Sequence, residues 1–196
     1  MTAKLDPDVA AVLEADDPMA DLVARHGPVT VTPAEHPFQR LVVSIVNQSI
    51  STAAADSIRE DLFSAFEQPI APEAVMEYGE EPLAAIVGGQ KAEYIRNVAG
   101  AYADGVIAPD VLAEASEQAV VQALTEIRGV GRWTADMYLL FVLGRDDVFP
   151  IGDLGVRRGM VAVYGDMSRE EMVEKARDWE PYRSYATKYL WLEYES

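Results

Sequence analysis

Apolar residues recur at intervals of three and four positions along nearly the whole chain, and this spacing constrains the fold more than any other feature. Over 36–50, for example, Phe38, Leu41, Val42 and Ile45 fall on one face of a helix. The same spacing, with prolines, serines and glycines at the ends, predicts helices over 7–15, 36–50, 51–66, 72–78, 81–87, 91–105, 116–126, 132–144, 153–163, 168–178 and 181–194. The sequence therefore predicts an all-α protein.

The length of the chain and the absence of linker-like segments predict a single domain over 1–196. A chain of 196 residues fits one globule, or two closely joined lobes, and no linker, repeat or low-complexity segment interrupts it. The one strand-like run, VTVT at 29–32, is too short and too isolated to imply a sheet.

Composition excludes several kinds of site. The chain has no cysteine, which rules out disulfides, thiolate zinc sites and cysteine-bound iron–sulfur clusters. Only two histidines, His26 and His36, are present, which argues against an imidazole-rich metal centre. No apolar run reaches the ~20 residues of a membrane span and no signal peptide opens the chain, so we expect a cytoplasmic protein with no membrane partner.

The charge balance is strongly acidic. Sixteen Lys and Arg face thirty-three Asp and Glu, giving a formal net charge of −17, and only four of the basic residues are lysines. A surface of this kind suits a halophile, whose cytoplasmic salt screens repulsion over a few ångströms. The alternative is an ordinary acidic protein that avoids nucleic acid. The sign of the charge therefore does not exclude a DNA-binding role.

A glycine pair, Gly129-Val130-Gly131, stands between two predicted helices. Glycine permits positive φ and lets another backbone approach closely. Amides at the start of the helix that follows favour a phosphate oxygen, a contact that needs few lysines. The simpler interpretation is a plain turn between packed helices.

Asp153 follows Gly131 by twenty-two positions, in the segment FPIGDLGVRRGM at 149–160. As the predicted N-cap of the next helix, its side chain is expected to accept backbone hydrogen bonds, which favour the ionised form of a carboxyl group. An anion beside a DNA-binding hairpin can stabilise positive charge on a deoxyribose, or orient or deprotonate an attacking water. The alternative is a purely structural cap.

Two segments taken together carry a family resemblance. IRGVGRWTADMYLLF at 127–141 and VFPIGDLGVRRGM at 148–160 resemble the helix–hairpin–helix, Gly/Pro-rich loop and aspartate of the DNA glycosylase superfamily, and within it the 3-methyladenine DNA glycosylase II (alkylbase) branch. HPFQRLVVSIVNQSISTAAA at 36–55 and PYRSYATKYLW at 181–191 are similar to the entry and closing helices of that branch.

The resemblance implies the all-α helix–hairpin–helix glycosylase fold, with two helical lobes and the active-site cleft between them. One lobe would comprise about 1–35 and 160–196, and the other, with the hairpin, about 36–159. The N-terminal sheet domain of larger bacterial members is missing, which implies the compact single-domain form.

The resemblance also assigns roles to individual residues. Asp153 matches the essential aspartate of the family. The hairpin residues match the phosphate-gripping turn, where relatives often hold a monovalent cation, so K⁺ or Na⁺ is expected at Gly129 and Gly131. The residues expected to contact DNA are Gly129, Val130, Gly131, Arg132 or Arg128, Thr134 and Ser49.

Trp133 and Trp191 match residues that line the pocket for the extruded base, where indole faces attract electron-poor alkylpurines. Gln48 matches a glutamine that probes the duplex at the vacated position. The alternative for the two tryptophans is core packing, and for Gln48 an exposed amide at a helix end. Ser49 stands where the family often has a bulky wedge, and serine is a poor wedge. Trp179 is expected in the core.

The function implied is that of a monofunctional glycosylase of base excision repair, acting on alkylated purines in double-stranded DNA as a monomer without a cofactor. Trp133 occupies the place of the lysine with which bifunctional relatives form a Schiff base, so no lyase activity is expected. The alternatives are a non-catalytic helix–hairpin–helix scaffold, or a glycosylase for deaminated or oxidised bases.

Overall fold

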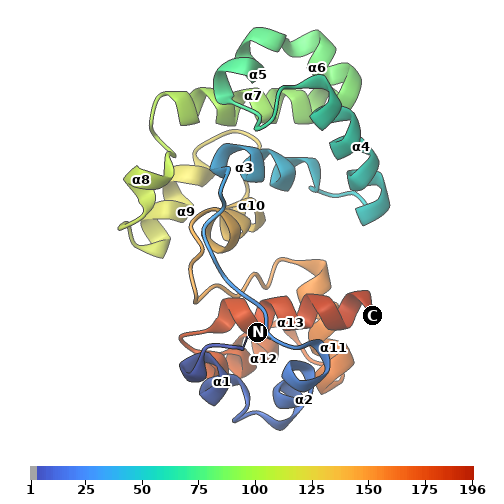
Figure 1. The fold of residues 1–196 in the computed structure, drawn as a ribbon, viewed down its shortest axis with the longest axis vertical. Helices are drawn as coiled ribbons and strands as arrows, with labels where there is room; N and C mark the ends of the chain where they lie inside the picture. The colour runs from blue at the N-terminus through green and yellow to red at the C-terminus, as the bar shows by residue number, and fades with distance from the viewer. Residues whose placement is uncertain (1–3) are drawn as a thin grey trace. The chain divides into compact units, whose positions relative to one another are not determined.

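The computed structural model describes residues 4–196, with the side chain of Thr52 left aside, and this part of the chain is built from helices (Figure 1). The segment at 29–32 has no regular secondary structure and forms no strand in the described range. The predicted all-α fold is confirmed. Within residues 4–196, none of the helices combines the length and apolar character that a membrane span requires.

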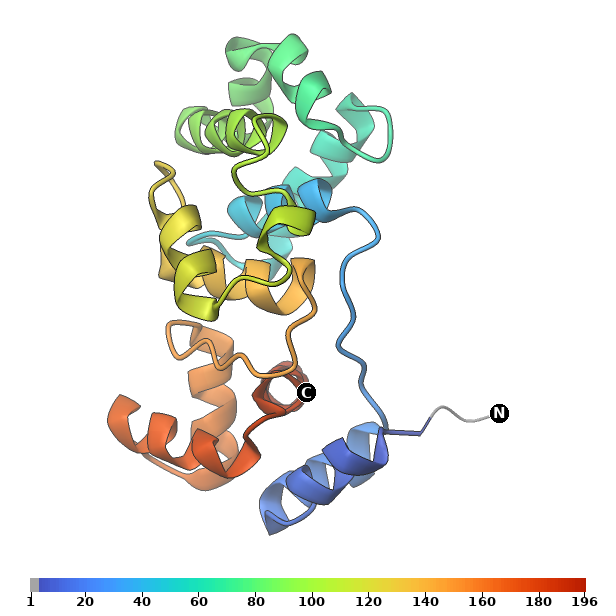
Figure 2. The same cartoon turned by 90° about the vertical axis from the view of Figure 1, so that its left-hand side faces the viewer.

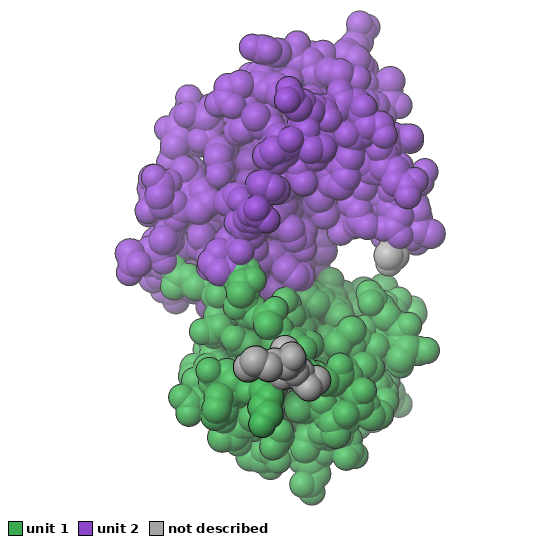
Figure 3. Space-filling view, in the orientation of Figure 1, with its two compact units in different colours: residues 1–32, 144–196 green, residues 33–143 purple. Residues whose placement is uncertain are grey.

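The chain divides into two compact units, coloured separately in Figure 3. Unit 1 comprises Met1–Thr32 and Gly144–Ser196, and unit 2 comprises Pro33–Leu143. The chain returns from unit 2 to unit 1 at 143–144, whereas the family resemblance implies a return near 159–160. The reason is that the helix containing Gly159 packs closely against the C-terminal helix of unit 1, so the whole loop and helix from 144 onward belong there.

Unit 1 contains the helices α1 (Pro7–Leu13), α2 (Asp17–His26), α11 (Leu154–Tyr164), α12 (Arg169–Ala176), the short 3-10 helix η2 (Arg177–Trp179) and α13 (Arg183–Glu195). Its core gathers residues from both ends of the chain: Val9, Leu13, Met19, Leu22, Val156, Met160, Met172, Ala176, Trp179, Ala186, Tyr189 and Leu190. Trp179 is fully buried, as predicted.

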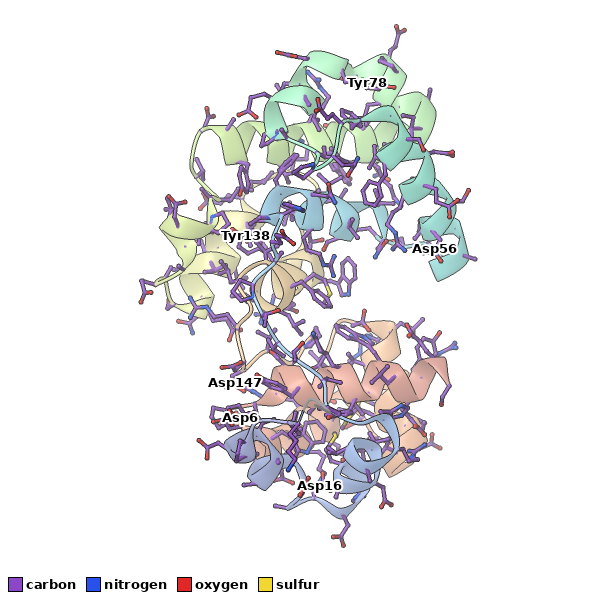
Figure 4. The ribbon with its side chains drawn as sticks, viewed as in Figure 1. Asp6, Asp16, Asp56, Tyr78, Tyr138 and Asp147 are labelled. Carbon is purple, nitrogen blue, oxygen red and sulfur yellow. The ribbon has the colours of Figure 1, made fainter. Side chains whose placement is uncertain are left out.

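A buried carboxylate ties this core together. Oδ2 of Asp16, which is labelled in Figure 4, accepts hydrogen bonds from the Tyr164 hydroxyl at 2.7 Å and from Trp179 Nε1 at 2.9 Å. The Lys175 ammonium lies 3.1 Å from the same oxygen. Burial, and then the bond to Asp16, raise the pKa of Tyr164 far above its ordinary value.

Unit 2 contains α3 (Pro37–Val46), α4 (Thr52–Ala65), α5 (Pro72–Tyr78), α6 (Glu80–Val87), α7 (Gly89–Ala103), α8 (Pro109–Leu112), α9 (Glu117–Thr125), α10 (Arg132–Met137) and the π-helical turn η1 (Tyr138–Val142) that continues α10. The apolar helix α3 lies between α7 and the α10–η1 helix, as Figures 1 and 2 both show. This position brings the C-terminal end of α3 to the loop between α9 and α10.

Several helices begin at the caps that the sequence predicts. Ser51 and Ser116 are N-caps whose hydroxyls accept from the amides of Ala54 and Ala119. Two helices, α2 and α8, were not predicted. The first begins with Asp17-Pro18, a start signal for a helix, and the second is a single turn of four residues.

Candidate functional site

Asp153 caps helix α11 in unit 1, as the sequence predicts. Its Oδ1 accepts a hydrogen bond from the backbone N–H of Val156 at 2.9 Å, the bond expected of an N-cap carboxylate. The side chain is half-buried. The N-terminus of a helix of eleven residues favours negative charge at this position.

The same oxygen has a second donor that the sequence did not reveal. Nε1 of Trp191, on α13, donates a hydrogen bond to Asp153 Oδ1 at 2.8 Å. Two residues that the sequence analysis gave separate roles, catalysis and base stacking, are therefore in direct contact. Because two donors converge on one oxygen, the plane of the carboxylate is fixed against α11 and α13.

Two glycines of α11 allow this contact. A Cβ on Gly159 would lie 2.3 Å from the backbone oxygen of Leu190, and a Cβ on Gly155 would lie 2.9 Å from Trp191 Cδ1. Helices α11 and α13 therefore approach more closely than any larger residue would permit. Sequence reasoning missed both residues, although glycines four apart on one helix are a signal of close helix packing.

Two arginines bond to the loop that carries Asp153, one near its end and one at its start. Arg157 donates from Nη1 to the carbonyls of Ile151 and Gly152, at 3.0 and 2.7 Å. At the start of the loop, Arg183 pairs with Asp147, labelled in Figure 4, through Nε and Oδ1 at 2.6 Å. These bonds orient the segment that delivers Asp153. Sequence reasoning also missed Arg157, for which the only signal was an arginine in the first turn.

The hairpin lies in unit 2 between α9 and α10. Gly129 has φ +100°, and a Cβ there would lie 2.1 Å from Cγ of Tyr94 on α7, so only glycine fits. Gly131 is the N-cap of α10 and accepts the first helical bond, from the amide of Ala135. Val130 is buried and its amide donates to the Ile127 carbonyl, so this predicted DNA contact faces the protein.

Gln48 and Thr134 belong to the same group. Gln48 Nε2 donates to the Gly129 carbonyl at 2.9 Å and to Thr134 Oγ1 at 2.8 Å. Thr134 is 1% exposed, so its hydroxyl faces Gln48, and any contact with DNA would fall to its backbone. The structure thus gives Gln48 and Thr134 partners inside the protein that the sequence did not predict.

Both arginines of the hairpin are paired with carboxylates. Arg132 bonds to Asp136 through Nε at 2.7 Å and to Glu117 through Nη2 at 2.8 Å, and Arg128 lies 3.0 Å from Glu93. Burial raises the pKa of Asp136 to about 6, against the opposing effect of Arg132. The pairs of Arg132 with Glu117 and of Arg128 with Glu93 are accessible to solvent, and ion pairs of that kind are weak and are screened by salt.

The carbonyl oxygens of the two glycines, where a monovalent cation is expected, each accept one hydrogen bond within the protein. The Gly129 carbonyl accepts from Gln48 and the Gly131 carbonyl accepts from Ala135, so a cation would have to share oxygens already bonded. Across residues 4–196, no group of three His, Cys, Asp or Glu side chains is arranged to hold a metal ion.

Two further predicted residues lie in unit 2. Trp133, the second residue of α10, is half-buried. Ser49 is exposed between α3 and α4, and its φ of +57° places a serine in the left-handed region, where such residues are uncommon.

Comparison with known proteins places these features in a family. Residues 42–181 match the HhH-GPD superfamily of base excision DNA repair proteins. An alkylbase DNA glycosidase-like protein of Schizosaccharomyces pombe is 32% identical over 186 residues, which span 90% of this chain and 87% of that protein.

Solved structures agree with this assignment. A DNA-3-methyladenine glycosidase of Bacillus halodurans aligns with a TM-score of 0.80 and 32% identity, covering 97% of this chain and 90% of that one. A 3-methyladenine DNA glycosylase of Schizosaccharomyces pombe, bound to abasic DNA, aligns with a TM-score of 0.84 and 26% identity, covering 94% and 95%. The chain belongs to the HhH-GPD superfamily of base excision DNA repair proteins.

Proposed function

We propose that this protein is a monofunctional DNA glycosylase that removes alkylated purines of the 3-methyladenine type from double-stranded DNA. The observation that carries the proposal is the Asp153 carboxylate, oriented by the Val156 amide and the Trp191 indole at the N-terminus of α11. The substrate class follows the names of the relatives that share the fold, which are 3-methyladenine and alkylbase glycosylases.

The chemistry begins when the damaged nucleotide rotates out of the duplex, which costs less for a weakened pair. An alkylated purine carries positive charge, so it leaves readily and accepts the electron pair of the breaking C1′–N bond. Asp153 stabilises the positive charge that develops on the sugar. Water then forms the new bond to C1′ and gives its proton to solvent, which leaves an abasic site.

Trp191 has two uses in this proposal. The edge of the indole orients Asp153 through Nε1, whereas stacking on a base uses the face of the ring. An electron-poor alkylpurine is attracted to such a face, and Trp133 is the second indole that the family resemblance assigns to the extruded base.

Hydrolysis without strand cleavage is the expected outcome. Trp133 stands where bifunctional relatives carry their amine nucleophile, and an indole cannot form a Schiff base. The lysine nearest in sequence to Trp191 is Lys188, whose ammonium donates to the Thr30 carbonyl.

Binding of DNA is assigned to the hairpin. Its arginines are paired with acids, so we propose that backbone amides at the start of α10 contact a phosphate. The net charge of −17 suits a cytoplasm rich in salt, which screens the repulsion between the protein and DNA. We propose that the protein acts there as a monomer. The reaction needs no cofactor, and a K⁺ or Na⁺ ion at the hairpin would share the carbonyl oxygens of Gly129 and Gly131 with the donors from Gln48 and Ala135.

Release of bases from methylated duplex DNA, measured by chromatography at several KCl concentrations, tests the proposal. The wild type should release 3-methyladenine and 7-methylguanine, and Asp153→Asn should lose more than about a hundredfold in rate while still binding abasic DNA. Asp6→Asn is the matched control, because Asp6 also caps a helix of unit 1. It should behave as the wild type.

Other outcomes separate the alternatives. Binding of DNA without release of any base would support a scaffold. Release of hypoxanthine or an oxidised base in place of alkylpurines would indicate a different lesion class. Full activity of Asp153→Asn would overturn the assigned catalytic role.

A further inference from the structure

The segment between α3 and α4 is joined to the hairpin by one side chain. Gln48 follows the last turn of α3, and its carboxamide reaches residues 81 and 86 positions away in the sequence, the Gly129 carbonyl and Thr134 Oγ1. The side chain is half-buried, whereas that of its neighbour Ser49 is exposed. Gln48 thus points into unit 2, toward the hairpin.

Chemistry fixes the orientation of this carboxamide. The Gly129 carbonyl can only accept a hydrogen bond, so the amino group of Gln48, and not its oxygen, must face it. Both protons of that group are then used, one on each partner. A side chain that has to enter a duplex would first have to break both bonds.

Side chains from two elements hold consecutive carbonyls of the hairpin. Asn97, on α7, donates from Nδ2 to the Arg128 carbonyl at 3.1 Å, and Gln48 donates to the next carbonyl, that of Gly129. The ring of Tyr94 packs under Gly129 at the same point. The turn is therefore supported from α7 on one side and from the end of α3 on the other.

We infer that Gln48 is a positioning residue of the hairpin, which sets DNA affinity through the conformation of residues 129–134 and does not fill the space left by the extruded base. Ser49, exposed and in the left-handed region, is then the residue that this segment presents to the outside. The inference rests on the proposed DNA-binding function and assigns a role within it.

The test compares Gln48→Met, which keeps the length but has no donor, with Gln48→Glu, which sets an oxygen against the carbonyl. Affinity is measured for a duplex with one abasic site and for the undamaged duplex of the same sequence. We expect both affinities to fall by the same factor, about tenfold or more. Single-turnover release at saturating enzyme should stay within about twofold of the wild type, because the hairpin acts on binding.

Gln122→Glu and Gln122→Met are the matched controls, since Gln122 is exposed on α9 in the same unit and takes the same changes. Both should bind as the wild type does. As the pH falls from about 8 to about 5, Gln48→Glu should regain part of its affinity, because a protonated carboxyl can again donate to the Gly129 carbonyl. Gln48→Met should not.

Hydrogen exchange at residues 129–134 in the free protein gives a readout independent of DNA. Faster exchange there in Gln48→Met, with unchanged exchange in α5 and α6, supports the inference even if Gln48→Glu fails to fold. Loss of affinity for abasic DNA alone, or no loss in either variant, would overturn it. If the wild type itself neither binds DNA nor releases a base, the proposed function fails instead.

Discussion

Nε1 of Trp191 donates a hydrogen bond to Oδ1 of Asp153 over 2.8 Å, joining two residues 38 positions apart on different helices. The bond makes the orientation of the proposed catalytic carboxylate depend on the packing of α13 against α11. Any change that moves the indole should therefore alter the rate of base release before it alters stability or DNA binding.

Replacing Trp191 with Phe tests this dependence, because phenylalanine keeps an aromatic face but has no N–H. We expect the single-turnover rate of base release to fall by about tenfold, the usual effect of losing one bond to a charged group. Affinity for abasic DNA should change little. Trp191→Ala, which removes the aromatic face as well as the N–H, should lose more than Trp191→Phe. An unchanged rate in Trp191→Phe would leave stacking as the only role of the residue.

Replacing the two glycines of α11 with alanine should affect stability at Gly159 and base release at Gly155. Gly159→Ala places a methyl 2.3 Å from the Leu190 backbone oxygen, so we expect a loss of roughly 1–3 kcal/mol in the free energy of unfolding by urea. Gly155→Ala meets side chains of Trp191 and Asp153 instead, and should reduce base release more than stability.

Gly100→Ala is the control for both glycine variants. Gly100 lies within α7 and an added Cβ would meet nothing within 4 Å, so the change should stabilise the protein by roughly 0.5–1 kcal/mol. Destabilisation in all three variants would contradict the packing argument.

Asp136 should make stability depend on pH. Burial raises its pKa from 3.8 to about 6, so between these values the folded protein holds a proton that the unfolded chain releases. The protonated Asp136 therefore contributes its full stabilisation below about pH 4. As the pH rises from about 4 to about 6, the free energy of unfolding should fall by about 2–3 kcal/mol. Asp136→Asn, whose amide oxygen still accepts from Arg132, should lack this fall.

The measurement is urea unfolding of both proteins at intervals across that pH range. The difference in unfolding free energy between wild type and Asp136→Asn should shift against the wild type as the pH rises. Parallel profiles would show that Asp136 titrates near its ordinary pKa.

Asp16 should be the most sensitive polar residue of unit 1. Asp16→Ala leaves the Tyr164 hydroxyl, the Trp179 indole and the Lys175 ammonium without their shared acceptor, and we expect a loss of about 3 kcal/mol in the free energy of unfolding. Asp178→Ala removes the exposed partner of the same lysine and should cost less than about 1 kcal/mol. Tryptophan fluorescence during unfolding reports both, and equal losses would contradict the assigned importance of burial.

The sequence by itself determined the helical architecture, because the spacing of apolar residues and the chemistry of helix ends are local. Ser51, Ser116 and Asp153 each accept the capping bond that their positions predicted. The hairpin and the family followed from short motifs in the same way. Two helices were not predicted. The single turn of α8 gives only a weak local signal, whereas α2 does carry a start signal at Asp17-Pro18 that the prediction did not use.

Only the tertiary structure decided which residues act together. The partners of Asp153 and Gln48 lie 38, 81 and 86 positions away, and such pairs depend on how closely helices approach. A pattern of residue types showed that Trp191 and Gln48 were candidates for DNA recognition. It could not show that the Trp191 indole would orient the Asp153 carboxylate, because that bond forms only when α13 packs on α11. Nor could it show that the amino group of Gln48 would donate both of its hydrogen bonds to the hairpin, because those bonds form only when α3 packs beside α10.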